Sequence, residues 1–342
     1  MTNEYVEKFG YRKYEGKTEP RWKRVWSLAW FELTSTWHKS TVGKVLLIII
    51  LAINLLVITV AALGISSFIR SLDEPERAEA IASVLNGMVG TYLSAGVGGD
   101  GRIVPSNSEE MSFSFNLGFL IIGLFAIAGS GSFADDRQGR LMEIYLSRVR
   151  RWEYATGKVG AILLYINIFA TFPLLIMGFL YVQALDLDHL EYLDYYAGIV
   201  LYGFLASLLL GLAILVLSSV VEKRMYASLG FYLLFILGSI FGAIVAQLDT
   251  SNEFLLLVSP SNFLELLAYV CLGDFDLFLQ SWDQNGEPGE NNGFISSYTP
   301  LSLDNGTGLE YYHILGATFA LVIIMFLFLV FRLYRLTTEA LT

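Results

Sequence analysis

The residue types that bind nucleotide phosphates are present, but not in the spacing that such a site requires. A phosphate-binding loop ends in Gly-Lys followed by Ser or Thr, whereas Gly43-Lys44 and Gly157-Lys158 are each followed by Val. The stretch 96–101 (GVGGDG) fits the dinucleotide-binding pattern, but no predicted strand precedes it. We therefore expect no ATP hydrolysis on this chain.

The sequence patterns for metal binding and for catalysis are as weak as those for nucleotide binding. The three histidines lie far apart, and no spacing typical of a zinc site occurs. Asp283, Asn285 and Glu287 alternate as calcium ligands do, but Pro288 stands where a calcium loop needs glycine. We expect no catalytic residue, no metal and no cofactor in this chain.

The composition indicates an all-α polytopic membrane protein. Of 342 residues, 55% are hydrophobic and 16% are charged, and the mean hydropathy is +0.56; soluble domains carry about 25% charged residues. A helix needs about 20 apolar residues to cross the hydrocarbon core. Six runs meet this need: 45–68, 113–133, 159–183, 195–221, 225–248 and 313–333.

The cations predict which side each loop faces, because Lys and Arg in short loops are retained in the cytoplasm. Six spans place both termini on one side. Nineteen of the 22 Lys and Arg then lie in the cytoplasmic segments, and only three in the outer loops. We therefore predict cytoplasmic N- and C-termini in the cell membrane, with tails 1–44 and 334–342 inside and the long loops 69–112 and 249–312 outside.

The segment 133–158 (FADDRQGRLMEIYLSRVRRWEYATGK) is the charged stretch on which the functional interpretation depends. It lies between two apolar runs and holds six cations and four anions. Leu141, Ile144 and Tyr145 recur at helical spacing, so part of the loop is expected to form an amphipathic helix at the inner surface. A solvated loop that only sets the topology is the alternative.

This segment resembles the first cytoplasmic loop of type-2 ATP-binding-cassette (ABC-2) exporter permeases. Such a loop carries a coupling helix, between spans 2 and 3, that sits on a separate ATPase subunit. The usual proline after the Leu-Ser pair is missing, and Gly139 lies one residue further from Ser147 than is typical. The resemblance implies contact with the ATPase for Asp136, Gly139, Arg140, Leu141, Glu143, Ile144, Leu146, Ser147, Arg148, Arg151, Glu153 and Lys158.

An interfacial helix is predicted before the first span. Its aromatic residues, with Leu28 beside them, fall near one helical face, opposite Lys23 and Arg24. Tryptophan at headgroup level and cations on the wet side are typical of a helix lying in the membrane surface. The aromatic residues are Trp22, Trp26, Trp30 and Trp37.

Two weaker apolar stretches are not counted as spans. The stretch 80–99 is uncharged but rich in Gly and polar residues. The stretch 254–272 is interrupted at Ser259 and Pro260, and we expect a broken or re-entrant element near the outer interface. A seven-span arrangement that includes it would move Arg332 and Arg335 outside.

Few polar side chains lie within the predicted spans. We expect Asn54, Asn167 and Gln183 to be hydrogen-bond partners between helices, and Pro173 to kink the third span. The small residues in Ser207-x-x-x-Gly211 and Gly238-x-x-x-Gly242 predict close helix packing within the subunit. The scarcity of charge within the spans argues against an ion-coupled carrier.

Together with the predicted topology, the resemblance implies a permease subunit of an ATP-driven transporter, with export as the expected direction. Its implied partners are cytoplasmic ABC ATPase subunits carrying the ATP and Mg, a second permease copy or paralogue, and membrane lipids. The alternative is a non-transporting scaffold that recruits cytoplasmic partners. An intramembrane enzyme has no catalytic constellation to support it.

Overall fold

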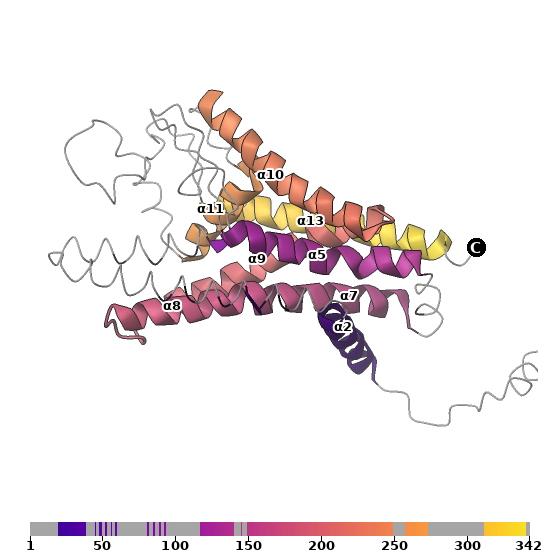
Figure 1. The fold of residues 1–342 in the computed structure, drawn as a ribbon, viewed down its shortest axis with the longest axis horizontal. Helices are drawn as coiled ribbons and strands as arrows, with labels where there is room; N and C mark the ends of the chain where they lie inside the picture. Colours follow the sequence, from indigo (N-terminus) through magenta and orange to yellow (C-terminus); the bar gives the residue numbers. More distant parts are fainter. Residues whose placement is uncertain are drawn as a thin grey trace, which may run out of the picture.

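The computed structural model of the protein describes residues 20–38, 117–139, 149–248, 257–272 and 311–339, Tyr145, and single positions between 45 and 93. These residues form helices, and the described part of the chain contains no β-strand. Figure 1 shows the long helices running roughly side by side, with one set of ends gathered near the C-terminus.

Three helical stretches are long and apolar enough to cross a membrane. The first is continuous through α7 (Arg151–Ile166), a π-helical segment η1 (Asn167–Thr171) and α8 (Phe172–Ala184). The others are α9 (Leu193–Val220) and most of α13 (Tyr311–Glu339). At 1.5 Å per residue, α9 is about 42 Å long, enough for the hydrocarbon core and part of both interfaces. The protein is therefore a helical membrane protein.

Two further helices occupy predicted spans. They are α5 (Leu117–Gln138) and α10 (Arg224–Leu248). The predicted first span, 45–68, is described only at single positions; those at Val45, Ile48 and Leu56 are helical. Six membrane crossings stay a prediction.

The basic loop is shorter than expected. α5 continues through Asp135, Asp136 and Arg137, and α7 begins at Arg151, so the connection comprises only residues 139–150. Both helices continue past their apolar runs because the helical conformation keeps the backbone groups hydrogen-bonded. Their long side chains can still reach polar surroundings.

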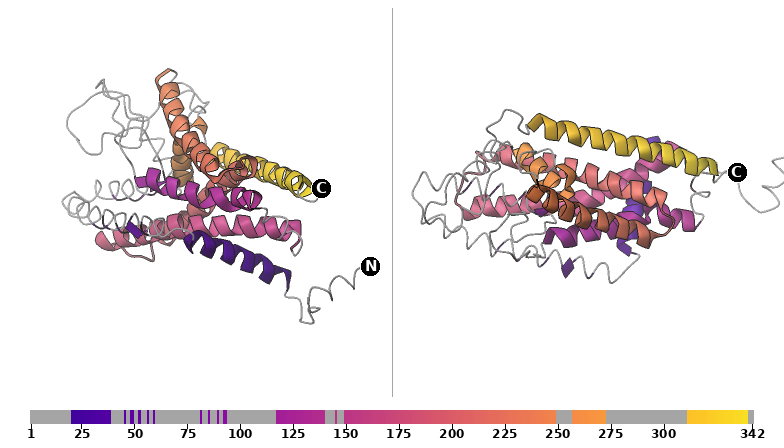
Figure 2. Two further views of the ribbon diagram at one scale, coloured as in Figure 1. Left: turned by 45° about the vertical axis from the view of Figure 1, so that its right-hand side comes forward. Right: turned by 90° about the horizontal axis from the view of Figure 1, so that it is seen from above.

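The centre of the bundle is α9, which packs against α5, α7, α10, α11 and α13. α13 lies along one flank (Figure 2) and leaves most of its apolar surface exposed. This arrangement suits a bilayer, since lipid can cover the apolar side chains that the protein leaves uncovered.

A polar contact between spans was correctly predicted at Asn167. Its amide donates to Ser207 Oγ on α9 at 2.8 Å, and Thr171 Oγ1 donates to Asn167 Oδ1 at 2.8 Å. These residues lie in and opposite η1, just before Pro173, where the helix adopts a π-helical turn. Gln183 instead contacts His189 of the α8–α9 turn at 3.0 Å. Asn54 lies outside the described residues.

The predicted small-residue contacts also occur within the chain. Gly211 faces Ile162 and Leu163 of α7, and Gly238 faces the ring of Pro260. Pro260 begins α11 (Pro260–Leu272), and Ser259 immediately precedes it. Pro in the first helical turn and Ser just before it are the usual signals of a helix start.

α11 packs against α9, α10 and α13. At 13 residues it is about 20 Å long, less than a bilayer core. The expectation of a re-entrant element at 254–272 stays a prediction. In the other weak stretch, 80–99, Ile81, Leu85 and Val89 are helical and buried, and the Leu85 carbonyl accepts a hydrogen bond from Tyr195 at the start of α9.

Candidate functional site

The N-terminal helix α2 (Arg21–His38) is bound to the bundle by one of its faces. It begins after Pro20, whose carbonyl accepts from Lys23 N at 3.0 Å, and it packs against α7. Arg24, Leu28 and Glu32 recur every four residues, which places them on one side of a helix. Each of them meets α7.

The aromatic residues of α2 point elsewhere. Trp22, Trp26 and Trp30 are all more than half exposed, and Trp26 stacks on Trp30 with ring centroids 6.4 Å apart. The side chain of Trp37 lies outside the described residues. Leu28 was expected on the tryptophan face, but it lies against α7. The helix thus has a mixed charged and apolar face against α7 and an aromatic face that the protein leaves uncovered.

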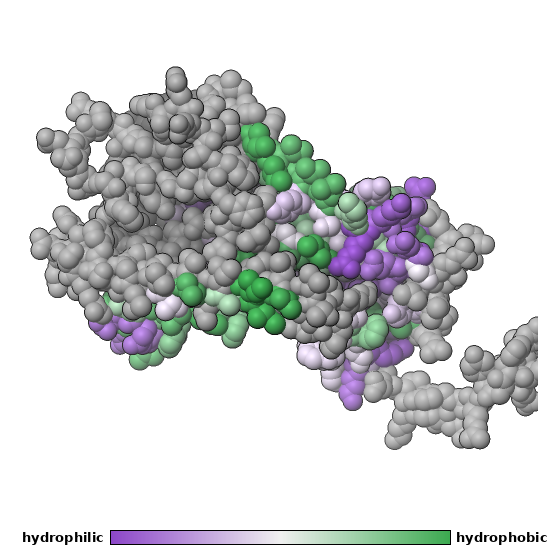
Figure 3. Space-filling model, viewed as in Figure 1, coloured by the Kyte–Doolittle hydropathy of each residue, from purple (hydrophilic) through white to green (hydrophobic). Residues whose placement is uncertain are grey.

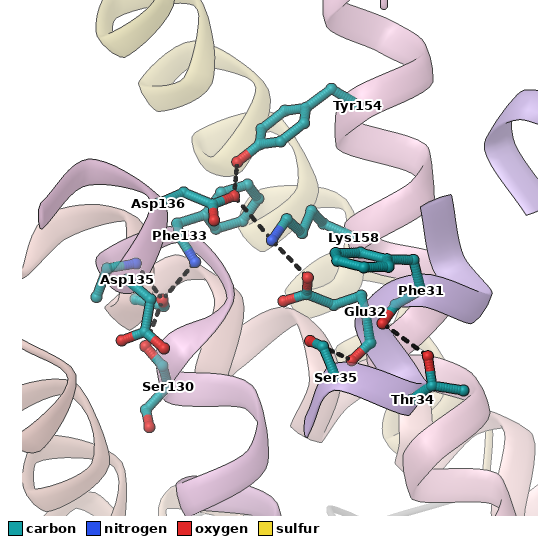
Figure 4. A network of polar contacts seen from close by, with 12 residues as sticks. Phe31, Glu32, Thr34, Ser35, Ser130, Phe133, Asp135, Asp136, Tyr154 and Lys158 are labelled. Carbon is teal, nitrogen blue, oxygen red and sulfur yellow. Dashed lines mark hydrogen bonds and ion pairs between the residues drawn. The ribbon is translucent and has the colours of Figure 1, made fainter. Parts of the chain in front are cut away.

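A buried cluster of three charges joins α2, α5 and α7 (Figure 4). Lys158 Nζ lies 2.8 Å from Glu32 Oε2 and 2.8 Å from Asp136 Oδ2. The side chains of Lys158, Asp136 and Glu32 are 2%, 8% and 13% exposed. One cation therefore connects two carboxylates on different helices.

Tyr154 completes the cluster. It lies one turn before Lys158 on α7, and its hydroxyl donates to Asp136 Oδ2 at 2.6 Å. Its ring packs edge-on against Phe133, with centroids 6.1 Å apart. Asp136 thus receives both an ammonium group and a hydroxyl, which compensates the loss of water around a buried carboxylate.

A second ion pair lies one turn nearer the start of α7. Glu153 Oε1 is 3.2 Å from Arg24 Nη2, although the two atoms do not have hydrogen-bond geometry. The other carboxylate oxygen accepts from the backbone N–H of Arg150 at 3.2 Å. Glu153 therefore holds the first turn of α7 and the N-terminal half of α2 together.

Between these ion pairs, the two helices approach closely at Gly157. A Cβ atom added there would collide with the side chain of Leu28, whereas one at Gly160 would meet Ala29 Cβ at an ordinary 3.8 Å. Gly157 is thus needed for the approach that lets Glu32 reach Lys158.

The ends of the other helices meet beside this cluster. Arg137 of α5 and Arg332 of α13 both donate to the Ser219 carbonyl in the last turn of α9, at 3.3 and 3.4 Å. Ser218 Oγ donates to the Ser130 carbonyl of α5 at 2.7 Å. Guanidinium groups at a helix C-terminus donate hydrogen bonds to its last carbonyls. Their positive charge also interacts favourably with the helix dipole. These contacts hold α5, α9 and α13 in register.

Aromatic rings accompany the cations at this end of the bundle. Lys23 lies over Trp22, Lys223 over Tyr226, and Arg151 over Tyr334, with each cation 5.5–6.0 Å from the ring centroid. Figure 3 shows hydrophilic residues at this end and apolar residues on the adjoining flank. Exposed aromatics beside Lys and Arg are typical of the headgroup level of a membrane.

The structure separates the predicted coupling residues into two groups. Asp136, Glu153 and Lys158 are buried and contact other parts of this chain, so they position helices and present no surface to a partner. Arg151 is exposed, and Gly139 forms the turn after α5. The remaining predicted residues lie outside the described part: Arg140, Leu141, Glu143, Ile144, Leu146, Ser147 and Arg148.

Within the connection, Tyr145 is helical and lies over Tyr154, with ring centroids 5.8 Å apart. Burial raises the pKa of Tyr145, and the negative charge of Asp136 adds to this effect while Lys158 opposes it. Tyr145, near the middle of the connection, thus packs against the buried cluster through Tyr154.

Sequence reasoning missed Glu32, Arg24 and Tyr154. The available signal was the four-residue spacing of Arg24, Leu28 and Glu32, which places two opposite charges on either side of an apolar residue. That spacing marks a shared face but does not identify the helix it meets.

The cluster of Glu32, Asp136 and Lys158 links α2, α5 and α7. Its charges are paired internally, and the described residues contain no group of three His, Cys, Asp or Glu that could hold a metal ion. A comparison with protein-family models found none that matches the chain, and a comparison with curated protein sequences found no match either.

Proposed function

We propose that this protein is the membrane-spanning permease subunit of an ATP-driven exporter of the ABC-2 type. It would work with cytoplasmic ATPase subunits that bind ATP and Mg, and with a second permease copy or paralogue. Six spans, with both termini cytoplasmic, complete the proposed topology. The proposal rests on the resemblance of the 134–158 segment, and the geometry around that segment supports it.

In the structure, the proposal is supported most directly by the cluster of Lys158, Glu32 and Asp136. These residues lie on the helices that precede and follow the 139–150 connection and on α2. A partner that pushes the connection therefore acts on α5, α7 and α2 together. A coupling element requires helices that move together in this way.

In the proposed cycle, closure of the ATPase dimer displaces the 139–150 connection. Leu141, Ile144 and Leu146 supply an apolar ridge, with Glu143, Arg148 and Arg151 pairing around it. Exposed ion pairs contribute about 0–1 kcal/mol each, so the apolar ridge is the main contact. Asp136, Glu153 and Lys158 transmit the displacement to the spans, which rock to release a substrate.

Leu146→Asp is expected to abolish the stimulation of the ATPase while leaving the amount of inserted, folded protein unchanged. A charge placed in an apolar contact loses the contact and must be desolvated. The rate of ATP hydrolysis by the ATPase alone is compared with its rate when bound to each permease variant in nanodiscs. The matched control is Leu190→Asp in the α8–α9 turn, where the residue is 74% exposed.

The outcome also separates a transporter from a scaffold. Affinity purification in mild detergent followed by mass spectrometry should recover an ATPase with a phosphate-binding loop. Repeated isolation without any ATPase, or equal stimulation by Leu146→Asp and Leu190→Asp, would count against the proposal and favour a non-transporting scaffold.

A further inference from the structure

A groove between α5 and α10 is not used by the proposed coupling. Its volume is about 680 Å³, within the range of sites that hold small ligands. From α5 it is lined by Gly123, Ile127 and Ser130, and from α10 by Arg224, Leu229 and Tyr232. Most of its lining is apolar, and Arg224 is the one charged side chain among the lining residues.

Small side chains on α5 create this space. Gly123 has no side chain where a Cβ atom would come within 3.2 Å of the Tyr232 ring. Ala126 and Ser130 continue the same side of α5 at intervals of three and four residues, and both line the groove. The long residues Ile127, Met225 and Leu229 form its rim and are about half exposed or more. The groove therefore opens on an apolar flank that faces lipid in a membrane.

Arg224 places a positive charge at the end of this groove. Its Nη2 donates to the Ile127 carbonyl at 2.7 Å, and its Nη1 lies 3.8 Å from Asp135 Oδ2. The second distance is too long for a hydrogen bond, and a guanidinium has five N–H donors. The guanidinium can thus donate to an additional anion without losing its contact to Ile127.

The depth of Arg224 in the membrane follows from the neighbouring residues Lys223 and Tyr226. It begins α10 and directly follows Lys223, which lies over the Tyr226 ring at 5.8 Å. This cation and aromatic ring belong to the headgroup level identified above. An amphiphile that put its polar group beside Arg224 would place its chain along Ile127 and Leu229, in the hydrocarbon region.

We propose that the groove binds a membrane phospholipid with an anionic headgroup. One acyl chain lies between α5 and α10, and the phosphate contacts the Arg224 guanidinium. The apolar lining of the groove complements the acyl chain, and the Arg224 guanidinium complements the phosphate through charge-assisted hydrogen bonds. The site needs only insertion of the protein in a bilayer, and it does not depend on the proposed transport function.

The test is lipid retention by the full chain. Protein reconstituted in nanodiscs of phosphatidylglycerol, or of phosphatidylcholine with the same acyl chains, is extracted into detergent and its bound lipid is counted by native mass spectrometry. We expect at least about tenfold greater retention of phosphatidylglycerol. Arg224→Gln should remove this preference, and Arg224→Lys should keep part of it.

Two variants distinguish the groove from general surface charge. Lys223→Gln makes the same charge change one residue away and should retain the lipid as the unaltered protein does. Ile127→Trp fills the groove from its rim and should lower retention of both lipids. If Arg224→Gln does not fold, Ile127→Trp decides the question.

Equal retention of the two lipids would overturn the proposal, as would a loss in Lys223→Gln as large as that in Arg224→Gln. A lipid-free dimer of the chain that covers this flank would overturn it as well. Association with the ATPase is measured separately, by affinity purification of the same variants, so failure of lipid binding and failure of the proposed function are separate results.

Discussion

Replacing Lys158 with methionine is expected to lower the free energy of unfolding by about 3–5 kcal/mol. The Glu32 and Asp136 carboxylates each lie 2.8 Å from Lys158 Nζ, and without this lysine the buried Asp136 and the largely covered Glu32 would share one site with no cation between them. Removing one member of a buried ion cluster is costly because the remaining charges must lose their water or their charge. Thermal unfolding of the purified protein in detergent measures the loss.

The matched control is Lys223→Met, because this lysine is exposed at the start of α10. Its effect is expected to stay within about 0.5 kcal/mol. Glu32→Gln should cost less than Lys158→Met, since Lys158 then keeps its pair with Asp136. The double variant Lys158→Met/Glu32→Leu should recover part of the loss by removing one unpaired carboxylate. Equal unfolding temperatures for Lys158→Met and Lys223→Met would contradict the role assigned to the cluster.

Gly157→Ala is expected to displace α2 and to lower stability by about 1–3 kcal/mol. The added methyl group would collide with Leu28, and the Leu28 Cβ and Cγ atoms leave little room for adjustment. Hydrogen–deuterium exchange should show faster exchange across residues 21–38, while the amides of α9 keep their protection. The result would show that the close approach of α2 depends on this glycine.

Gly160→Ala provides the control on the same helix. Its methyl group meets Ala29 at an ordinary distance, and alanine favours helix over glycine by up to about 1 kcal/mol. The control should therefore be neutral or stabilising. Leu28→Ala, added to Gly157→Ala, should restore protection of α2. Identical exchange and unfolding in the two glycine variants would show that α2 does not pack as described.

Several features could be predicted because they depend on neighbouring residues along the chain. Long apolar runs identified α9, α13 and the continuous α7–α8 helix, since a span needs only length and hydropathy. An interruption was expected at Ser259 and Pro260, and α11 begins at Pro260, but the start of a helix there was not predicted although proline favours the first helical turn. Asn167 was correctly expected to bond between helices because an amide within an apolar span needs a partner.

Helix ends were less well predicted. Charges marked 134–158 as a loop, but α5 includes Asp136 and α7 includes Lys158. A charged residue can continue a membrane helix where a partner compensates its charge. Here the two residues compensate each other, and both helices extend.

The sequence by itself determined that the chain is helical, that it enters a membrane, and where its cations concentrate. The pairing of Glu32 with Lys158, 126 positions further along the chain, was decided by the tertiary structure. So was the choice of the face that α2 turns toward α7, through Leu28 and Gly157. The physical reason is that hydropathy and charge act along the chain, whereas the value of a buried charge depends on which distant helix brings its counter-ion within 3 Å.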